Sequence, residues 1–171
     1  MNRFKKAVSA LVLTGSIFAG SSSAIASHSY TYQGLVSVFK GIPLVCTITV
    51  VKVPDHAIDP VTGLPTGPEL NTGTVTVNVS PPIDPACAIV NVTSNPMRYT
   101  QGAAGIDGWK DMVVENFYVE TITAGDCAAA TVTIRKRQIP GTSQWEMDVT
   151  STIPQASFGG PCIITGVIPK V

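Results

Sequence analysis

Apolar and polar residues alternate along several short segments of the chain, a pattern typical of half-buried strands. The clearest case is the segment 73–79 (GTVTVNV), in which Val75, Val77 and Val79 share one face. A period of two residues indicates antiparallel sheets with one buried and one solvated face. The segments predicted as strands on this basis are 44–53, 73–79, 87–93, 112–123, 131–137, 144–153 and 162–168.

Glycine, proline and aspartate separate these segments, and no helical stripe follows the leader. Such a run of short strands predicts an all-β fold, either an antiparallel β-sandwich or a Greek-key barrel. Two stretches interrupt the pattern. Residues 54–72 hold four prolines and two glycines and predict a long exposed loop. Residues 99–111 predict a second loop ending near Trp109, whose ring we expect to cover the core rather than contact a partner.

The first 26 residues have the composition of a cleavable signal peptide of bacterial type. Positive residues precede an apolar stretch from Ala7 to Ala19, and small residues follow, ending in Ala-Ile-Ala at 24–26. We expect cleavage between Ala26 and Ser27. The apolar stretch is shorter than the about 20 residues that span a bilayer, so we expect no membrane span in the mature chain.

The remaining residues, 27–171, have a length that suits one domain with its own core. Three of the 11 Lys and Arg residues lie in the leader, so the mature chain carries 8 of them against 11 Asp and Glu. Such a balance gives no electrostatic reason to bind nucleic acid or an anionic membrane. The basic cluster Arg135-Lys136-Arg137 alternates along a predicted strand, and we interpret it as a solvated edge.

Four cysteines, Cys46, Cys87, Cys127 and Cys162, follow the leader. An even number in an exported chain predicts two disulfides, because a zinc site would need a much closer pair. A faint internal repeat, in which a cysteine opens a strand and a later proline closely precedes a second cysteine, favours pairing 46 with 87 and 127 with 162. Four cysteines allow three connectivities, so this pairing is a preference.

A search for catalytic groups finds no nucleophile with a base and an orienting residue. His28 lies near the predicted mature N-terminus, and His56 lies in the proline-rich stretch, where a base, a metal ligand or a solvated residue would all fit. We expect the solvated residue. Carboxylates that could serve glycoside hydrolysis are Glu115, Glu120, Glu146 and Asp148. Carboxylates that could bind calcium are Asp55, Asp59, Glu69, Asp107 and Asp111. Neither set follows a recognised motif. We therefore expect no enzyme activity, no metal and no cofactor.

Charged residues make up 13% of the chain, about half the usual share for a soluble domain. A surface so short of charge tends to adhere to apolar interfaces or to copies of itself. The composition therefore favours a secreted binding, structural or surface-active protein over an enzyme.

The cysteine frame resembles a known family. Gly41-Ile-Pro-Leu-Val-Cys46-Thr-Ile-Thr49, the Gly-Asp-Cys at 125–127 and the Pro-Cys-x-x-x-Gly at 161–166 resemble the bacterial protein activator of alkane oxidation (PraB-type) family. The resemblance implies a small secreted protein without catalytic residues, linked to growth on long-chain hydrocarbons and to their emulsification. The proline-rich stretch 54–72 departs from that family.

A second hypothesis is a structural or adhesive subunit of a surface appendage or biofilm matrix, similar to a pilin. In that case residues 29–39 would be an N-terminal extension that adds a strand to a neighbouring subunit.

Overall fold

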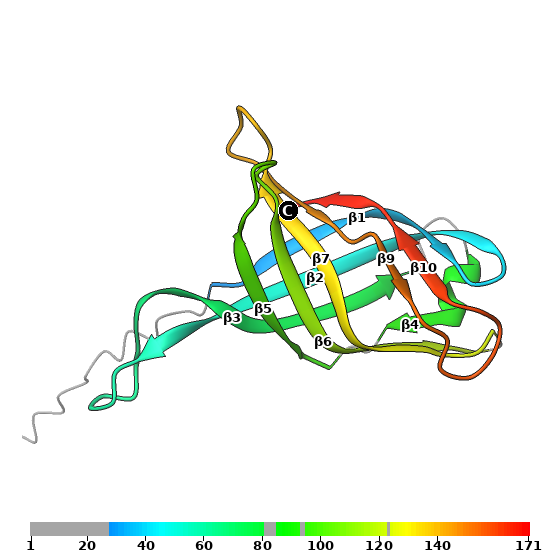
Figure 1. Cartoon of the computed structure of the whole chain (residues 1–171), viewed down its shortest axis with the longest axis horizontal. Coiled ribbons are helices and arrows are strands. Elements are labelled where there is room, and N and C mark those ends of the chain that lie inside the picture. The colour runs from blue at the N-terminus through cyan, green and yellow to red at the C-terminus, as the bar shows by residue number, and fades with distance from the viewer. Residues whose placement is uncertain (1–27, 81–84, 93–94, 123) are drawn as a thin grey trace, which may run out of the picture.

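The computed structural model of the protein describes residues 28–80, 85–92, 95–122 and 124–171, and these form one antiparallel sheet curled into a half-barrel (Figure 1). The predicted signal segment 1–26, with its cleavage point after Ala26, lies outside the described residues. The elements are β1 (Tyr30–Phe39), β2 (Pro43–Ile58), β3 (Pro65–Ser80), the 3₁₀ helix η1 (Pro85–Ile89), β4 (Val90–Val92), β5 (Met97–Ala104), β6 (Lys110–Thr121), β7 (Cys127–Gln138), β8 (Trp145–Asp148), β9 (Ser151–Ile153), β10 (Cys162–Thr165) and β11 (Val167–Pro169).

The strands follow the order β11-β8-β7-β6-β5-β3-β2-β1-β10-β9, and β4 joins β6 outside this path. Each end of this path also bridges to a strand near the opposite end, which curls the sheet. A bridge between Tyr32 and Lys170 links the C-terminus to β1, and a bridge between Cys127 and Gln155 links the segment after β9 to β7. The expected all-β antiparallel class is confirmed, and the sheet is single and curled.

The core lies inside the curl, where alternate residues of each long strand meet. The face predicted for 73–79 is confirmed, since Val75 and Val77 are buried. The predicted strand 112–123 alternates in the same way: Phe117 and Val119 are buried while Tyr118 between them is exposed. The largest fully buried side chains include Tyr99, Ile48, Met112, Met147, Ile153, Ile168, Val50 and Val114.

Two disulfides fasten the sheet at separate places. Cys46 on β2 is bonded to Cys87 in η1, and Cys127 on β7 is bonded to Cys162 on β10. All four are at most 1% exposed. The pairing predicted from the internal repeat is therefore confirmed, and two disulfides indicate an oxidising, extracytoplasmic compartment.

The predicted long loop at 54–72 is wrong, because β2 and β3 continue through most of it as a two-stranded extension. We call residues 54–70 the arm; it projects beyond the rest of the sheet (Figure 1). Its turn is closed by Asp59, whose side chain accepts hydrogen bonds from the Val61 N–H (2.8 Å) and the Thr62 hydroxyl (2.9 Å). The strand register shifts after Pro54, and such irregularities accommodate prolines within paired strands.

Other predicted boundaries also change. The second predicted loop is reduced to residues 105–109 between β5 and β6. Within the described part of the predicted strand 87–93, which is residues 87–92, only 90–92 are extended, after η1. The segment 162–168 is divided at Gly166, where a Cβ would lie 2.8 Å from Val36 Cγ1. Close packing against β1 therefore requires glycine at this break.

Residues 29–39 do not form a free extension. Strand β1 pairs with β2 along its whole length, with β10 through its last three residues, Ser37 to Phe39, and with Lys170 at Tyr32. Its backbone hydrogen-bonding groups are thus largely used within the chain, which removes the argument for strand donation by this segment.

Each disulfide is predicted to stabilise the fold mainly by restricting the unfolded chain. Replacing Cys127 and Cys162 together by alanine should lower the free energy of unfolding by about 3–4 kcal/mol, because the bond closes a loop of 35 residues. Urea unfolding at pH 7 measures the change. Equal stability of the variant and the oxidised wild type would contradict this account of the bond.

Candidate functional site

A cavity of about 320 Å³ opens at the end of the curl where β1 begins and β7 and β11 end. Its wall is built from strands that are distant in sequence, which the sheet order brings around one mouth. The residues that line it are Tyr30, Tyr32, Lys52, Glu69, Leu70, Asn71, Gln101, Lys110, Lys136, Trp145 and Lys170.

Four of the five lysines in the described part of the chain line this cavity, and we call it the lysine pocket. Three of them, Lys52, Lys110 and Lys136, continue rows of inward-facing core residues. Lys136, for example, lies opposite Met147, which is fully buried. Directly opposed residues of antiparallel strands share a face. The lysines therefore point inward because the strand period puts them there.

Lys52 is the most enclosed of the four, with only 2% of its surface exposed. Its ammonium group lies 5.4 Å from the centre of the Tyr30 ring and 5.0 Å from that of Tyr99. Aromatic faces attract a cation, although less strongly than a carboxylate would. Burial lowers the pKa of Lys52, while the charge of Glu69 opposes that shift.

Lys136 faces the strongest repulsion. It lies directly opposite Lys110 in the register of β6 and β7, and like charges in that position destabilise a sheet. Burial, followed by repulsion from Lys52, lowers the pKa of Lys136 to about 7. At neutral pH this amine is therefore near its titration midpoint.

Glu69 is the one carboxylate among the residues that line the pocket. The Tyr30 hydroxyl donates a hydrogen bond to Glu69 Oε1, and this bond, with burial, raises the pKa of Tyr30 to about 12. Burial likewise raises the pKa of Tyr32 to about 12. One carboxylate faces four lysines, so the pocket keeps a positive potential.

Gln101 adds a polar group that the protein leaves unused. Its Oε1 atom is shielded from solvent and has no hydrogen-bond partner among the described residues. This unpaired atom is an acceptor, so it would take a hydrogen bond from a donor and gives no support for an anion. The pocket therefore combines four ammonium donors with one unpaired amide acceptor around one space.

The fifth lysine has a structural role. Lys40 is 5% exposed, and its ammonium group donates hydrogen bonds to the carbonyl oxygens of Phe158 (3.0 Å) and Gly160. It also lies 3.3 Å from Cys127 Sγ. Lys40 thus holds the segment before β10 against the second disulfide.

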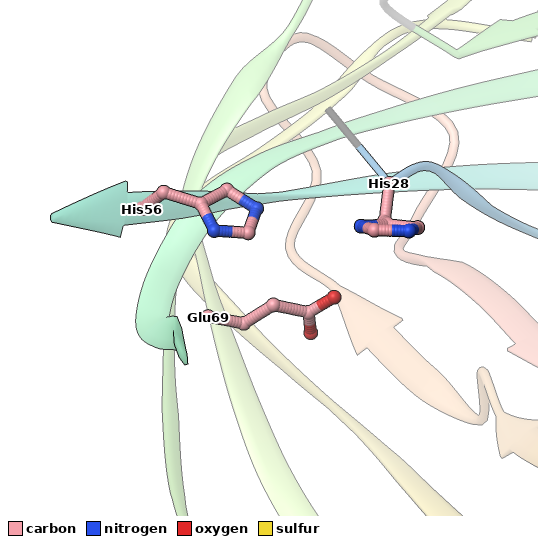
Figure 2. Close-up of side chains that lie close together, drawn as sticks. All are labelled: His28, His56 and Glu69. Carbon is pink, nitrogen blue, oxygen red and sulfur yellow. The ribbon is translucent and has the colours of Figure 1, made fainter. Parts of the chain in front are cut away.

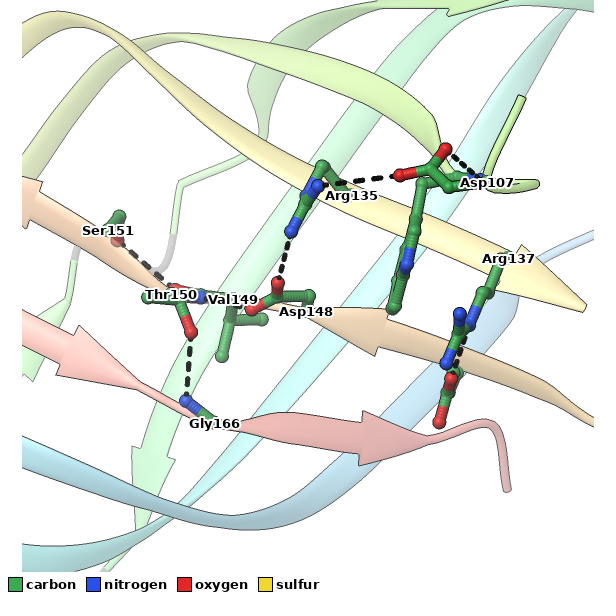
Figure 3. A network of polar contacts seen from close by, with 10 residues as sticks. Asp107, Arg135, Arg137, Asp148, Val149, Thr150, Ser151 and Gly166 are labelled. Carbon is green, nitrogen blue, oxygen red and sulfur yellow. Dashed lines mark hydrogen bonds and ion pairs between the residues drawn. The ribbon is translucent and has the colours of Figure 1, made fainter. Parts of the chain in front are cut away.

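The interpretation of Arg135-Lys136-Arg137 as a solvated edge is wrong at its central residue. The two arginines do face outward: Arg135 NH2 lies 3.0 Å from Asp148 Oδ2, and Arg137 Nε lies 2.7 Å from Glu146 Oε1 (Figure 3). Lys136 points to the opposite face, into the lysine pocket. A strand alternates its faces, so three consecutive basic residues cannot share one.

Trp109 does not cover the core. Its ring lies on the outer face, where the guanidinium carbons of Arg137 and Arg135 approach its centre at 4.3 and 5.2 Å. The expectation for Trp109 is therefore wrong, because cation–π contacts with the outward arginines hold the ring outside the curl.

The structure disperses the carboxylates considered for hydrolysis or calcium. Asp55 accepts hydrogen bonds from Arg98 and Thr72, and the bond to Arg98 is the largest cause of its lowered pKa. Glu115, Glu120 and Asp111 are exposed, and Glu146 and Asp148 form ion pairs with arginines. Asp107 accepts a hydrogen bond from the Trp109 N–H, and Asp59 accepts the hydrogen bonds that close the turn of the arm. Glu69 lies instead beside His28 and His56.

Comparisons with protein families, curated proteins and solved structures found no match to this chain. Within the described residues, no helix is long and apolar enough to cross a membrane. The lysine pocket therefore has to be interpreted from its own chemistry, and converging ammonium groups are suited to binding an anion.

The pocket could have been detected in part from the sequence. In LVCTITVVKV the row of Leu44, Cys46, Ile48 and Val50 continues to Lys52, and a lysine in a buried row is unusual. Lys136 similarly follows the row of Val132 and Ile134. The sequence does not show that Lys52 and Lys136 lie near each other, because this depends on the order of the strands in the sheet.

The lowered pKa of Lys136 predicts a pH dependence of stability in the ligand-free protein. Between pH 7 and about 10.5 the unfolded chain keeps the proton that the folded protein has lost, so the free energy of unfolding should rise with pH in this range. In a Lys136→Met variant this rise should be smaller. Urea unfolding at pH 6, 7.5 and 9 measures it, and identical pH profiles for the two proteins would contradict the assignment.

Proposed function

We propose that this protein is a secreted, non-catalytic binding protein of apolar interfaces, whose lysine pocket binds the head group of an anionic amphiphile. The observation that carries the proposal is the convergence of Lys52, Lys110, Lys136 and Lys170 on one cavity. Close ammonium groups repel one another, and a bound anion removes that cost. A pocket of this kind is expected to hold a carboxylate, sulfate or phosphate group.

Apolar surface near the pocket supports an amphiphile over a simple anion. Leu70 and Trp145 line the pocket itself. The arm beside it carries Ile58, Val61 and Leu64, which are 57%, 89% and 48% exposed. The arm reaches the pocket at Glu69 and Leu70, and its exposed apolar side chains offer a path for a hydrocarbon chain once its head group is bound.

The resemblance to the PraB-type family agrees with this proposal. Oxidation of a long-chain hydrocarbon ends in a carboxylic acid, which is an anionic amphiphile at neutral pH. A protein that binds such molecules at the surface of a hydrocarbon droplet would aid emulsification and uptake. The predicted signal segment and the two disulfides agree with a function outside the cytoplasm.

Dodecanoate binding, measured by isothermal titration calorimetry below the micellar concentration, tests the proposal. Wild type should bind dodecanoate more tightly than acetate or uncharged dodecanol. Lys136→Met should weaken binding about 10-fold or more, because a charge-assisted hydrogen bond contributes roughly 1.5–3 kcal/mol. Wild-type affinity should also fall as the pH rises above 7, because the deprotonated amine carries no charge.

The matched control is Arg98→Gln, which removes the same charge from an exposed residue outside the pocket. It should bind dodecanoate as wild type does. If the two variants lose affinity equally, the effect is one of net charge, and the pocket is not the binding site.

The arm is predicted to supply the contact with hydrocarbon. Replacing Val61 and Leu64 by serine should reduce the lowering of interfacial tension between hexadecane and water, because exposed apolar area drives adsorption. Ile106→Ser, which changes a fully exposed residue in the β5–β6 turn, should have less effect. Equal loss in both proteins would show that the arm has no special part.

A structural or adhesive subunit is the second candidate, supported by an apolar outer face on β1 and β2. Leu35, Phe39 and Val45 are 51%, 42% and 45% exposed, and they share a face because Ser37 between the first two lies opposite Val45. Such a face could bury itself against a second copy. Size-exclusion chromatography discriminates the candidates: a monomer at roughly 100 μM, a concentration at which association with a Kd of about 1 μM would be nearly complete, argues against assembly.

A further inference from the structure

The chain has two histidines, and the fold brings both of them to one carboxylate. His28, His56 and Glu69 each offer a ligand atom, and these atoms all lie within 4.8 Å of one another. Figure 2 shows the two imidazole rings and the carboxylate around a common space. We propose that these three side chains form a binding site for a divalent transition-metal ion of the zinc type.

The site is assembled from three segments of the chain. His56 on β2 and Glu69 on β3 are cross-strand partners, so their side chains share a face. The register is irregular on both sides of this pair, between Pro54 and His56 and between His56 and Ala57. Irregularities of this kind redirect side chains and are frequent beside functional sites.

His28 reaches the same place through the pairing of β1 with β2. Strand β1 begins with Tyr30 opposite Lys52, and His28 precedes it by two residues at the base of the arm. The hydroxyl of Tyr30 donates to Glu69 Oε1 and so orients the carboxylate. Carboxylate ligands of metals are commonly held by such a second hydrogen bond.

An independent observation also points to a ligand. His56 is half-buried, and its Nε2 atom is shielded from solvent without a hydrogen-bond partner among the described residues. Polar atoms hidden from water usually have a partner, and an exception calls for an explanation. A metal ion on the imidazole would supply that partner.

The donor set selects the class of metal. Two imidazoles and a carboxylate suit zinc and similar transition metals, whereas calcium and magnesium prefer oxygen ligands throughout. Zinc bonds of about 2.0–2.2 Å require the ligand atoms to approach to about 3.4 Å. His28 and Glu69 are exposed and can close this gap by side-chain rotation.

The three residues would leave a coordination position for water or an anion. Glu69 also lines the lysine pocket, so the positive charges there oppose a cation and favour an anionic additional ligand. The metal site and the lysine pocket therefore share Glu69, which would be a metal ligand in the first and offsets positive charge in the second.

The test is a Zn²⁺ titration of untagged protein, since a histidine tag would add ligands. Calorimetry should give one ion per chain, and NMR should show both imidazole signals shifting together until one equivalent is added. His28→Ala and His56→Ala should each weaken binding by more than the roughly 10–100-fold that follows loss of a supporting group. Glu69→Gln should weaken it as well, whereas the exposed carboxylate variant Glu115→Gln serves as the matched control and should not.

The two sites can be distinguished by their variants. His56→Ala, which changes a residue outside the lining of the lysine pocket, should lose zinc affinity while binding dodecanoate as wild type does, and Lys136→Met should do the reverse. Circular dichroism and thermal unfolding confirm that each variant is folded. Failure to bind zinc, a shift in only one imidazole, or wild-type affinity in either histidine variant would overturn the metal site without bearing on the pocket.

Discussion

The alternation of side chains along the strands governs both the core and the candidate site. Each long strand directs one row of residues into the curl, and along most of its length that row is apolar. At the open end the same rows finish in lysines, Lys52 on β2 and Lys136 on β7 among them. Core and pocket are therefore one continuous interior, apolar in the middle and cationic at its mouth. Four of the five lysines in the described part of the chain lie at this mouth.

Unbalanced charge gives that mouth its chemistry. Lys110 and Lys136 lie opposite each other, and Glu69 is the one carboxylate in the pocket wall. The protein can relieve the repulsion by losing a proton, as the low pKa of Lys136 indicates, or by taking up an anion. The same carboxylate lies beside His28 and His56. Binding at either site would thus change the electrostatic field at the other.

Much of the fold could be predicted from local patterns. Alternation identified the buried faces of 73–79 and 112–123, and the repeated cysteine context indicated the observed disulfides. Prolines misled the prediction at 54–72, because composition shows that proline disfavours a regular ladder but not where a register shift accommodates it. The same limit applies to Trp109, whose place depends on arginines of a neighbouring strand.

Period and composition report the face on which a residue lies, because both are properties of one segment. They do not report which residue of another strand lies beside it. The strand order, the curl of the sheet and the return of the C-terminal strands to β1 bring together Lys52, Lys136 and Lys170. The same features place His28 beside Glu69. Those features arise from burying every apolar row at once, a condition that involves the whole chain and cannot be evaluated segment by segment.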